Sequence, residues 1–209
     1  MSNSEKNGTE KNHPDQERTS NRRKQVLEAA ECCFRRSGFH GASMAEISKA
    51  AGMSAGHIYN YFDSKDAIIG TFVEQNIERI SALVLDLKQR DDPLQAMIDD
   101  TERCVLDNLH PGTWVLPLEI FAEASRNPEV ATLLQDADSH SRGALRAVLK
   151  LGRAKRGLAN DDALLDGRIE ALIAMFQGLH LRALHNPTLD ETATVAAFRL
   201  ALAALLFSA

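Results

Sequence analysis

The sequence has few cysteines, and they lack the spacing of a metal site. Three occur in 209 residues, an odd number that also argues against a disulfide framework. Adjacent Cys32 and Cys33 are predicted to pack within a helix, and Cys104 to be a small core residue, with redox sensing as the alternative for Cys104. This cysteine usage fits a reducing compartment, so we expect the protein in the cytoplasm.

Long apolar runs and the common catalytic motifs are also missing. The most apolar stretch, residues 195–209, contains Arg199 and is too short to span a membrane. No basic segment followed by an apolar core marks a signal peptide. There is no nucleophile elbow, phosphate-binding glycine loop or HExxH motif, and His180 and His185 do not share a helix face well. We therefore expect no enzyme activity, cofactor, metal or membrane association.

Residues 43–65 contain two short helical patterns separated by a tight turn. Ser43 stands at an N-cap position with Glu46 three residues further on, which is the spacing of a capping box. Gly52 can end the first helix in a left-handed conformation, and Ser54 can cap the second. Two short helices joined by a glycine-containing turn predict a helix-turn-helix.

The second of these helices, predicted over residues 55–62, has an unusual outer face. Aromatic residues make up 5% of the chain, yet three lie within four positions here. Ile58 and Phe62 form an apolar pair that can hold the helix to a core. The other residues are small or carry groups that suit base edges and phosphates. The alternative is a helical hairpin whose aromatic side chains are simply core.

Residues 23–69 resemble the DNA-binding domain of the TetR/AcrR family of bacterial regulators. The resemblance covers about a quarter of the chain and is carried by the pattern Arg23-x-x-Val26-Leu27-x-Ala29-Ala30-x-x-x-Phe34-x-x-x-Gly38-Phe39, then Ser43-Met44-x-x-Ile47-x-x-x-Ala51-Gly52-Met53-Ser54-x-Gly56-x-Ile58-Tyr59-x-Tyr61-Phe62-x-Ser64-Lys65-Asp66. It implies an all-α fold, with an N-terminal three-helix helix-turn-helix domain and a C-terminal helical domain for ligand binding and dimerisation. It also implies that the long helix after the DNA-binding domain couples ligand binding to DNA binding.

Charge divides the chain in the same way. The whole chain has a net charge of −5, but residues 18–65 carry eight Lys or Arg against four Asp or Glu, a net +4. A basic head on an acidic body favours DNA binding at the head.

Apolar periodicity predicts helices throughout and no strand. We expect a disordered polar arm over residues 1–17, a DNA-binding domain over 18–65, and an effector-binding and dimerisation domain over 66–209. The helices outside the helix-turn-helix are predicted at 19–38, 64–90, 93–109, 113–125, 128–153, 161–184 and 189–207.

The predicted DNA contacts fall into two classes. Ser43, Ser54 and Lys65 are expected on phosphates, and the tyrosines on the flanking backbone or thymine methyls. The start of the second helix, with His57 and Asn60, is expected to approach bases. The full predicted set is Arg23, Ser43, Ser54, Ala55, Gly56, His57, Tyr59, Asn60, Tyr61 and Lys65.

A mostly apolar effector pocket is predicted between the helix at 64–90 and the helices at 93–125 and 161–184. Aromatic and methionine side chains beside a few polar groups suit a lipophilic or cationic compound, although each residue could equally be plain core. The candidates are Phe72, Met97, Arg103, Trp114, Glu119, Phe121, Met175, Phe176, Gln177 and His180.

The last two helices are the predicted homodimer interface, because the final helix is apolar over more than one face. The alternative is that it closes the core of the monomer. The predicted interface residues are Leu172, Phe176, Leu179, Val195, Phe198, Leu202 and Leu205.

Together these features predict a ligand-responsive transcriptional repressor that binds a palindromic DNA operator as a homodimer and is released by a small molecule. Activator action, or a helical adaptor that does not bind DNA, are the alternatives.

Overall fold

The computed structural model of the chain describes residues 13–208, which form ten α-helices and no β-strand. The predicted all-α fold is confirmed. The chain divides into two compact units, the first ending at Ile69 and the second beginning at Gly70. Among the described residues, none of the helices combines the length and the apolar character that a membrane crossing requires.

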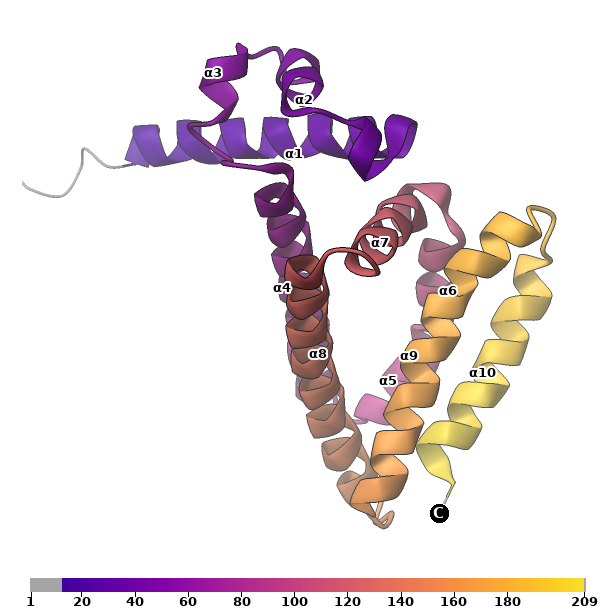
Figure 1. Ribbon diagram of the computed structural model, residues 1–209. Coiled ribbons are helices and arrows are strands. Elements are labelled where there is room, and N and C mark those ends of the chain that lie inside the picture. Colours follow the sequence, from indigo (N-terminus) through magenta and orange to yellow (C-terminus); the bar gives the residue numbers. More distant parts are fainter. Residues whose placement is uncertain (1–12, 209) are drawn as a thin grey trace, which may run out of the picture. The chain divides into compact units, whose positions relative to one another are not determined.

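The first unit packs three helices, α1 (His13–Gly41), α2 (Met44–Ala50) and α3 (Ala55–Ile58), around a small apolar core (Figure 1). Gly38 interrupts α1 with a φ of 70°, a conformation that costs glycine little. The bend brings Phe39 back onto Phe34, with ring centroids 5.4 Å apart. The central buried side chains of this unit are Val26, Ala30, Phe34, Ile47, Ile58 and Phe62.

Helix α1 begins earlier than predicted. It starts at His13 rather than at residue 19, so the end of the expected disordered arm is helical, and residues 1–12 lie outside the described part of the chain. Residues 16–24 of this helix are exposed on all sides. Because no glycine or proline occurs between residues 15 and 37, nothing in the sequence stops the helix from continuing beyond its packed part.

The predicted caps of the helix-turn-helix are confirmed. Ser43 and Glu46 form a reciprocal capping box: the Ser43 Oγ accepts from the Glu46 N–H at 3.2 Å, and the Ser43 N–H donates to Glu46 Oε2 at 2.9 Å. Gly52 adopts a φ of 63° after α2. The Ser54 Oγ then accepts from the His57 N–H at 3.3 Å at the start of α3.

Helix α3 is shorter than the predicted 55–62. After Ile58 the chain tightens into bonds of the 3₁₀ type, from the Asn60 N–H to the His57 carbonyl and from the Tyr61 N–H to the Ile58 carbonyl. Tyr59, Asn60 and Tyr61 therefore lie on a turn that continues α3.

Seven helices complete the chain, with α4 crossing the boundary between the units. Two differ from prediction. The segment 93–109 is split at Asp100, where the Thr101 hydroxyl bonds the Met97 carbonyl at 3.2 Å and competes with the helical ladder. His110 is an N-cap rather than a turn residue, since its Nδ1 accepts from the Gly112 N–H at 3.0 Å. The bounds are α4 (Lys65–Gln89), α5 (Pro93–Asp99), α6 (Thr101–Leu109), α7 (Pro111–Ala124), α8 (Pro128–Lys155), α9 (Asp162–His185) and α10 (Glu191–Phe207).

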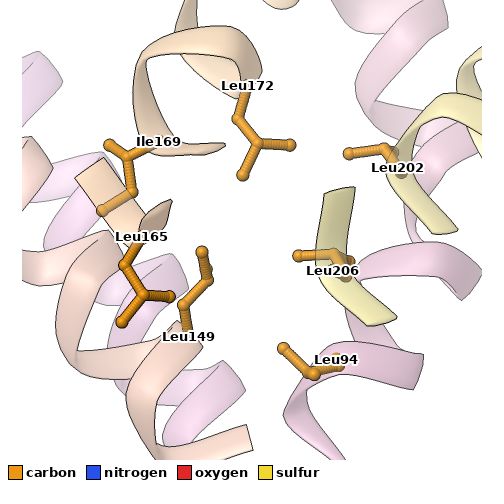
Figure 2. Packing of buried hydrophobic residues seen from close by; sticks show 7 residues of the cluster. All are labelled: Leu94, Leu149, Leu165, Ile169, Leu172, Leu202 and Leu206. Atoms are coloured by element: carbon orange, nitrogen blue, oxygen red, sulfur yellow. The ribbon is translucent and has the colours of Figure 1, made fainter. Parts of the chain in front are cut away.

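The core of the second unit lies where α5, α8, α9 and α10 meet (Figure 2). Gly152 lets α8 approach α5 closely, because a Cβ at this position would lie 2.6 Å from Leu94 Cγ. The buried cluster consists of Leu94, Leu149, Leu165, Ile169, Leu172, Leu202 and Leu206.

Most of the side chains predicted for the dimer interface belong to the core of the single chain instead. Leu172, Leu179, Val195 and Leu202 are buried within the single chain, where no second copy can reach them. Phe176 and Phe198 pack edge to face with centroids 5.5 Å apart, and Leu205 packs against the buried cluster of Figure 2. The final helix therefore closes the monomer core with these side chains, which was the alternative interpretation.

Candidate nucleic-acid interface and effector pocket

The exposed surface of α3 and its following turn carries a small polar cluster centred on His57. Its Nδ1 lies 3.3 Å from Asn60 Nδ2, and its Nε2 lies 3.2 Å from Tyr61 Oη. The His57 and Tyr61 rings meet edge to face with centroids 5.3 Å apart. Both ring nitrogens are thus engaged within the cluster, and the direction of the bond to Tyr61 depends on the tautomer of the ring. The Tyr61 hydroxyl has capacity for a further bond to an outside group such as a phosphate oxygen.

The start of α3 offers an open backbone beside this cluster. Ala55 and Gly56 are exposed, and a Cβ added to Gly56 would meet no atom within 4 Å. Packing within the chain therefore does not require glycine at position 56. Tyr59 is also outward, with 52% of its surface exposed. This face combines small residues with hydrogen-bonding and aromatic groups, as a helix entering a DNA groove requires.

The arginine and the lysine of the predicted DNA-binding set are both held within the first unit. The Lys65 ammonium donates to the carbonyls of Phe39 and Ala42, the latter at 2.7 Å, and lies 4.4 Å from the centroid of the Phe39 ring. The Arg23 guanidinium donates to the Tyr61 carbonyl at 2.8 Å and covers the Phe62 ring. Arg23 thus fixes the turn after α3, whereas Lys65 ties the start of α4 to the end of α1. Ser43 and Ser54 serve as helix caps.

The ten predicted pocket residues lie in different environments. Met97 and Phe176 pack against the leucine core, and Arg103 and Gln177 are exposed. Phe121 is 40% exposed. The remaining half-buried side chains among the ten are Phe72, Trp114, Glu119 and Met175.

One of the ten, Trp114, lines a pocket of about 210 Å³. Its indole Nε1 donates to the Leu109 carbonyl at 3.2 Å, which holds the ring at the wall. The other lining residues come from the ends of α6 and α9 and the start of α10: Leu109, Ala183, Asn186, Pro187, Leu189 and Glu191.

His180, also predicted from the sequence, is buried between α9 and α6. Its Nε2 lies 2.8 Å from Asn108 Oδ1, while its buried Nδ1 has no hydrogen-bond partner among the described residues. Burial, with a smaller contribution from Arg79, lowers the pKa of the imidazole. Sequence reasoning missed Asn108, although its spacing from Val105 and Leu109 on an amphipathic helix places it on the buried face.

The cysteines divide between packing and surface. Cys33 is buried as predicted, whereas Cys32 is exposed on α1. Burial raises the pKa of the Cys104 thiol. A raised pKa reduces the thiolate fraction at neutral pH, which supports a packing role for Cys104 over redox sensing.

Three buried charged residues, Glu123, Arg153 and Arg168, were not predicted. Arg153 of α8 is almost fully buried and donates to the carbonyls of Ala159, Leu206 and Ser208 at 2.7–3.0 Å. Glu123 of α7 is buried with Arg126 3.6 Å away. Arg153 bonds the last turn of α10, so its role is to fix the end of the fold.

Comparison with known proteins matches both parts of the chain to one group of regulators. Residues 26–70 match the family profile described as bacterial regulatory proteins, tetR family, and residues 90–206 match the profile of the BetI-type transcriptional repressor, C-terminal. The transcriptional regulator UidR of Escherichia coli K12 is 34% identical over 118 residues, 54% of this chain and 57% of UidR. The alignment thus spans little more than half of UidR. The regulator CymR of Pseudomonas putida is 29% identical over 151 residues, 70% of this chain and 72% of CymR.

Solved structures show the same fold. Salmonella enterica GusR is 26% identical with a TM-score of 0.69, over 90% of this chain and 96% of GusR. Bacillus subtilis FadR in complex with stearoyl-CoA has a TM-score of 0.71 at 16% identity, over 88% of this chain and 97% of FadR. A regulator from Saccharomonospora viridis in complex with choline has a TM-score of 0.65 at 24% identity, over 88% of this chain and 94% of that protein.

Proposed function

The chain belongs to the TetR family of bacterial regulatory proteins, and on that premise we propose that it is a cytoplasmic repressor that binds a palindromic operator as a homodimer and is released by a small-molecule effector. The observation that carries the DNA-binding part is the exposed cluster of His57, Asn60 and Tyr61 beside the open backbone of Gly56. These groups lie on the second helix of a helix-turn-helix and on the turn that continues it. The second helix is the element that enters the major groove in such motifs.

The proposed contacts differ in role. His57 and Asn60 approach base edges, and the backbone at Ala55 and Gly56 comes close to the groove wall. Ser43, Ser54, Tyr59 and Tyr61 contact the flanking DNA backbone. Arg23 and Lys65 keep their predicted place in the interface, but their charged groups already bond carbonyls. Arg23 therefore acts chiefly by fixing the turn after α3, and Lys65 by tying the start of α4 to the end of α1.

Two neighbours in fold support a small-molecule effector for the second unit: FadR is solved with stearoyl-CoA and the S. viridis regulator with choline. In this chain the pocket beside Trp114 is the proposed entry to the effector site. Its walls include Leu109, Ala183 and Leu189, which suit a partly apolar compound.

The homodimer is proposed to form through the outward faces of α9 and α10, which lie side by side (Figure 1). Leu181 and Leu184 on α9 are 48% and 53% exposed, and Leu200 on α10 is 75% exposed. Exposed Ala196 and Ala197 flank Leu200 and allow close approach of another helix. Exposed leucines on adjacent helices, beside small residues, are typical of a surface that a partner covers.

The test is to sequence the genomic fragments that the purified full chain retains, followed by gel shifts at a stated salt concentration. We expect one enriched palindrome whose half-sites are spaced for two heads. A helical adaptor would retain no fragment above background, and that result would reject the proposal.

A further inference from the structure

We propose that the buried pair His180 and Asn108 presents an unprotonated ring nitrogen to the effector, which is therefore a molecule carrying a hydroxyl or N–H donor on a mostly apolar body. The inference rests on the proposed function, in which the second unit binds a small-molecule effector. It names the chemistry that this site recognises.

The hydrogen bonds of Asn108 determine which ring nitrogen of His180 carries the proton. The Asn108 amide lies 2.8 Å from the Cys104 carbonyl oxygen through Nδ2. A carbonyl can only accept, so the amide nitrogen must face it, and Oδ1 must face His180. Since Oδ1 can only accept, His180 Nε2 carries the proton and donates across 2.8 Å. In a neutral imidazole, Nδ1 is then a bare acceptor.

That acceptor is buried and unused. Only 8% of the His180 surface is exposed, and Nδ1 has no hydrogen-bond partner among the described residues. Leaving a buried acceptor without a donor is unfavourable, so a donor brought by a ligand gains more here than on the surface. The Asn108 bond holds the ring, so the lone pair has a fixed direction.

The ring stays neutral near neutral pH. Burial and the positive charge of Arg79 both lower the pKa of His180. A protonated ring would donate from both nitrogens and favour a carboxylate, whereas the neutral ring sets its lone pair against any ligand group that can only accept. The site therefore selects alcohols and N–H compounds over ethers.

The surroundings define the rest of the ligand. Next to His180, Leu179 packs with Val105 and Val195 in a buried apolar cluster that also contacts Phe176 and Phe198. The pocket of about 210 Å³ begins one residue after Asn108, at Leu109, and one helical turn after His180, at Ala183. A ligand entering beside Trp114 meets apolar side chains together with the polar Asn186 and Glu191. His180 lies within one helical turn of Ala183 in the chain, and Asn108 directly precedes Leu109.

The first experiment reads the tautomer directly, by ¹⁵N NMR of the full chain labelled at histidine. We expect the His180 resonances of an imidazole protonated at Nε2, assigned by their loss in His180→Gln. An Nδ1-protonated ring would overturn the proposal. This measurement needs no ligand, and the tautomer is read on the wild-type chain.

The second experiment compares donors with matched ethers. The probes are 1-octanol, cyclohexylmethanol and menthol, each with its methyl ether, titrated against the fluorescence of Trp114, the single tryptophan of the chain. We expect the alcohols to bind roughly five- to tenfold more tightly, as one neutral hydrogen bond supplies, and to shift the Nδ1 resonance. His180→Gln keeps an amide donor for Asn108, but its carbonyl oxygen is bonded to the same carbon as the donating nitrogen and cannot take the position of Nδ1, so the preference should fall. His185→Gln, an exposed change on the same helix, should retain it.

Equal binding of alcohols and ethers, no binding of any alcohol, or an unmoved Nδ1 resonance would each overturn the proposal. Gel shifts on the same preparation separate this failure from that of the proposed function. A protein that binds operator DNA but ignores donors loses only the assignment of His180.

Discussion

The imidazole of His57 and the ring of Tyr61 meet edge to face at 79°, with His57 Nε2 and Tyr61 Oη 3.2 Å apart. This contact joins the last turn of α3 to the residues that follow it. Because α3 is only one turn long, the pair gives the exposed face an order that the backbone alone would not provide.

The first prediction concerns His57. His57→Ala should weaken operator binding by about 1–3 kcal/mol, the range for a base contact, and leave the thermal midpoint unchanged because the side chain is exposed. Gel shifts with operator and with unrelated DNA at one salt concentration measure both affinity and specificity. His185→Ala, in the second unit, is the control. Wild-type affinity in His57→Ala would remove this residue from the interface.

Gly56 provides a test that separates DNA contact from folding. A Cβ at this helical position meets nothing within 4 Å, so Gly56→Ala should keep or raise stability by up to about 1 kcal/mol through helix propensity. Operator binding should nevertheless fall, because the methyl group would hold the backbone away from the groove. Gly143→Ala, equally unobstructed in α8, should stabilise without affecting DNA. If Gly56→Ala binds as tightly as wild type, the backbone does not approach DNA there.

Lys65 is predicted to contribute chiefly to the stability of the fold rather than to direct contact with DNA. Lys65→Met keeps the apolar stem and removes the ammonium that bonds the Phe39 and Ala42 carbonyls. We expect a loss of about 1–3 kcal/mol in the free energy of unfolding, because two partly buried acceptors lose their donor. Urea denaturation followed by circular dichroism measures it, with exposed Lys49→Met as control. Unchanged stability with reduced DNA affinity would instead return Lys65 to a direct phosphate contact.

Local signals explain what the sequence could predict. The caps at Ser43 and Ser54 and the glycine at position 52 depend on neighbours within a few residues, and the structure confirms all three. The split at Asp100 depends on a bond from the Thr101 hydroxyl to the Met97 carbonyl, which no periodicity reveals. The polar composition of residues 13–17 predicted disorder, but polar residues do not prevent a helix.

The sequence could not show which face of α10 packs in the core and which faces outward, for a different reason. This helix is apolar on several sides, so the spacing of Val195 and Leu202 does not distinguish core from interface. Only the packing of α5, α8 and α9 around it assigns Leu202 inward and Leu200 outward. The proposed effector site was similarly underdetermined: the sequence selected His180, but its hydrogen bond with Asn108 became visible only when α6 and α9 were placed together.

His180 also predicts a pH dependence of stability. Its folded pKa lies below the ordinary 6.5 because of burial and Arg79. Between the two pKa values the unfolded chain therefore binds a proton at His180 and the folded chain does not. This contribution to stability is present above pH 6.5 and is lost as the pH falls below 6.5 towards the folded pKa. Urea midpoints measured downwards from pH 7 should decline less steeply in His180→Gln than in wild type, and His185→Gln should follow wild type. Parallel curves for all three proteins would show that His180 titrates normally.

The last prediction distinguishes the two sides of the helical pair α9 and α10. Leu200 is 75% exposed, so Leu200→Glu removes no core contact and should leave the chain folded. If a second copy covers this surface, the buried carboxylate is unfavourable in the dimer and the protein should sediment as a monomer at micromolar concentration. Operator binding should fall with dimerisation, because a palindrome then engages only one head at a time.

Two matched variants make the interpretation unambiguous. Leu85→Glu alters a leucine of α4 that is 59% exposed and lies outside the proposed interface, so it should stay dimeric and bind DNA. Leu202→Asp places a charge in the core of Figure 2 and should unfold the second unit, as seen by circular dichroism, rather than yield a folded monomer. A wild-type protein that sediments as a monomer, or a Leu200→Glu variant that remains a dimer, would exclude this surface, because the only large exposed apolar side chain on α10 would then have no partner.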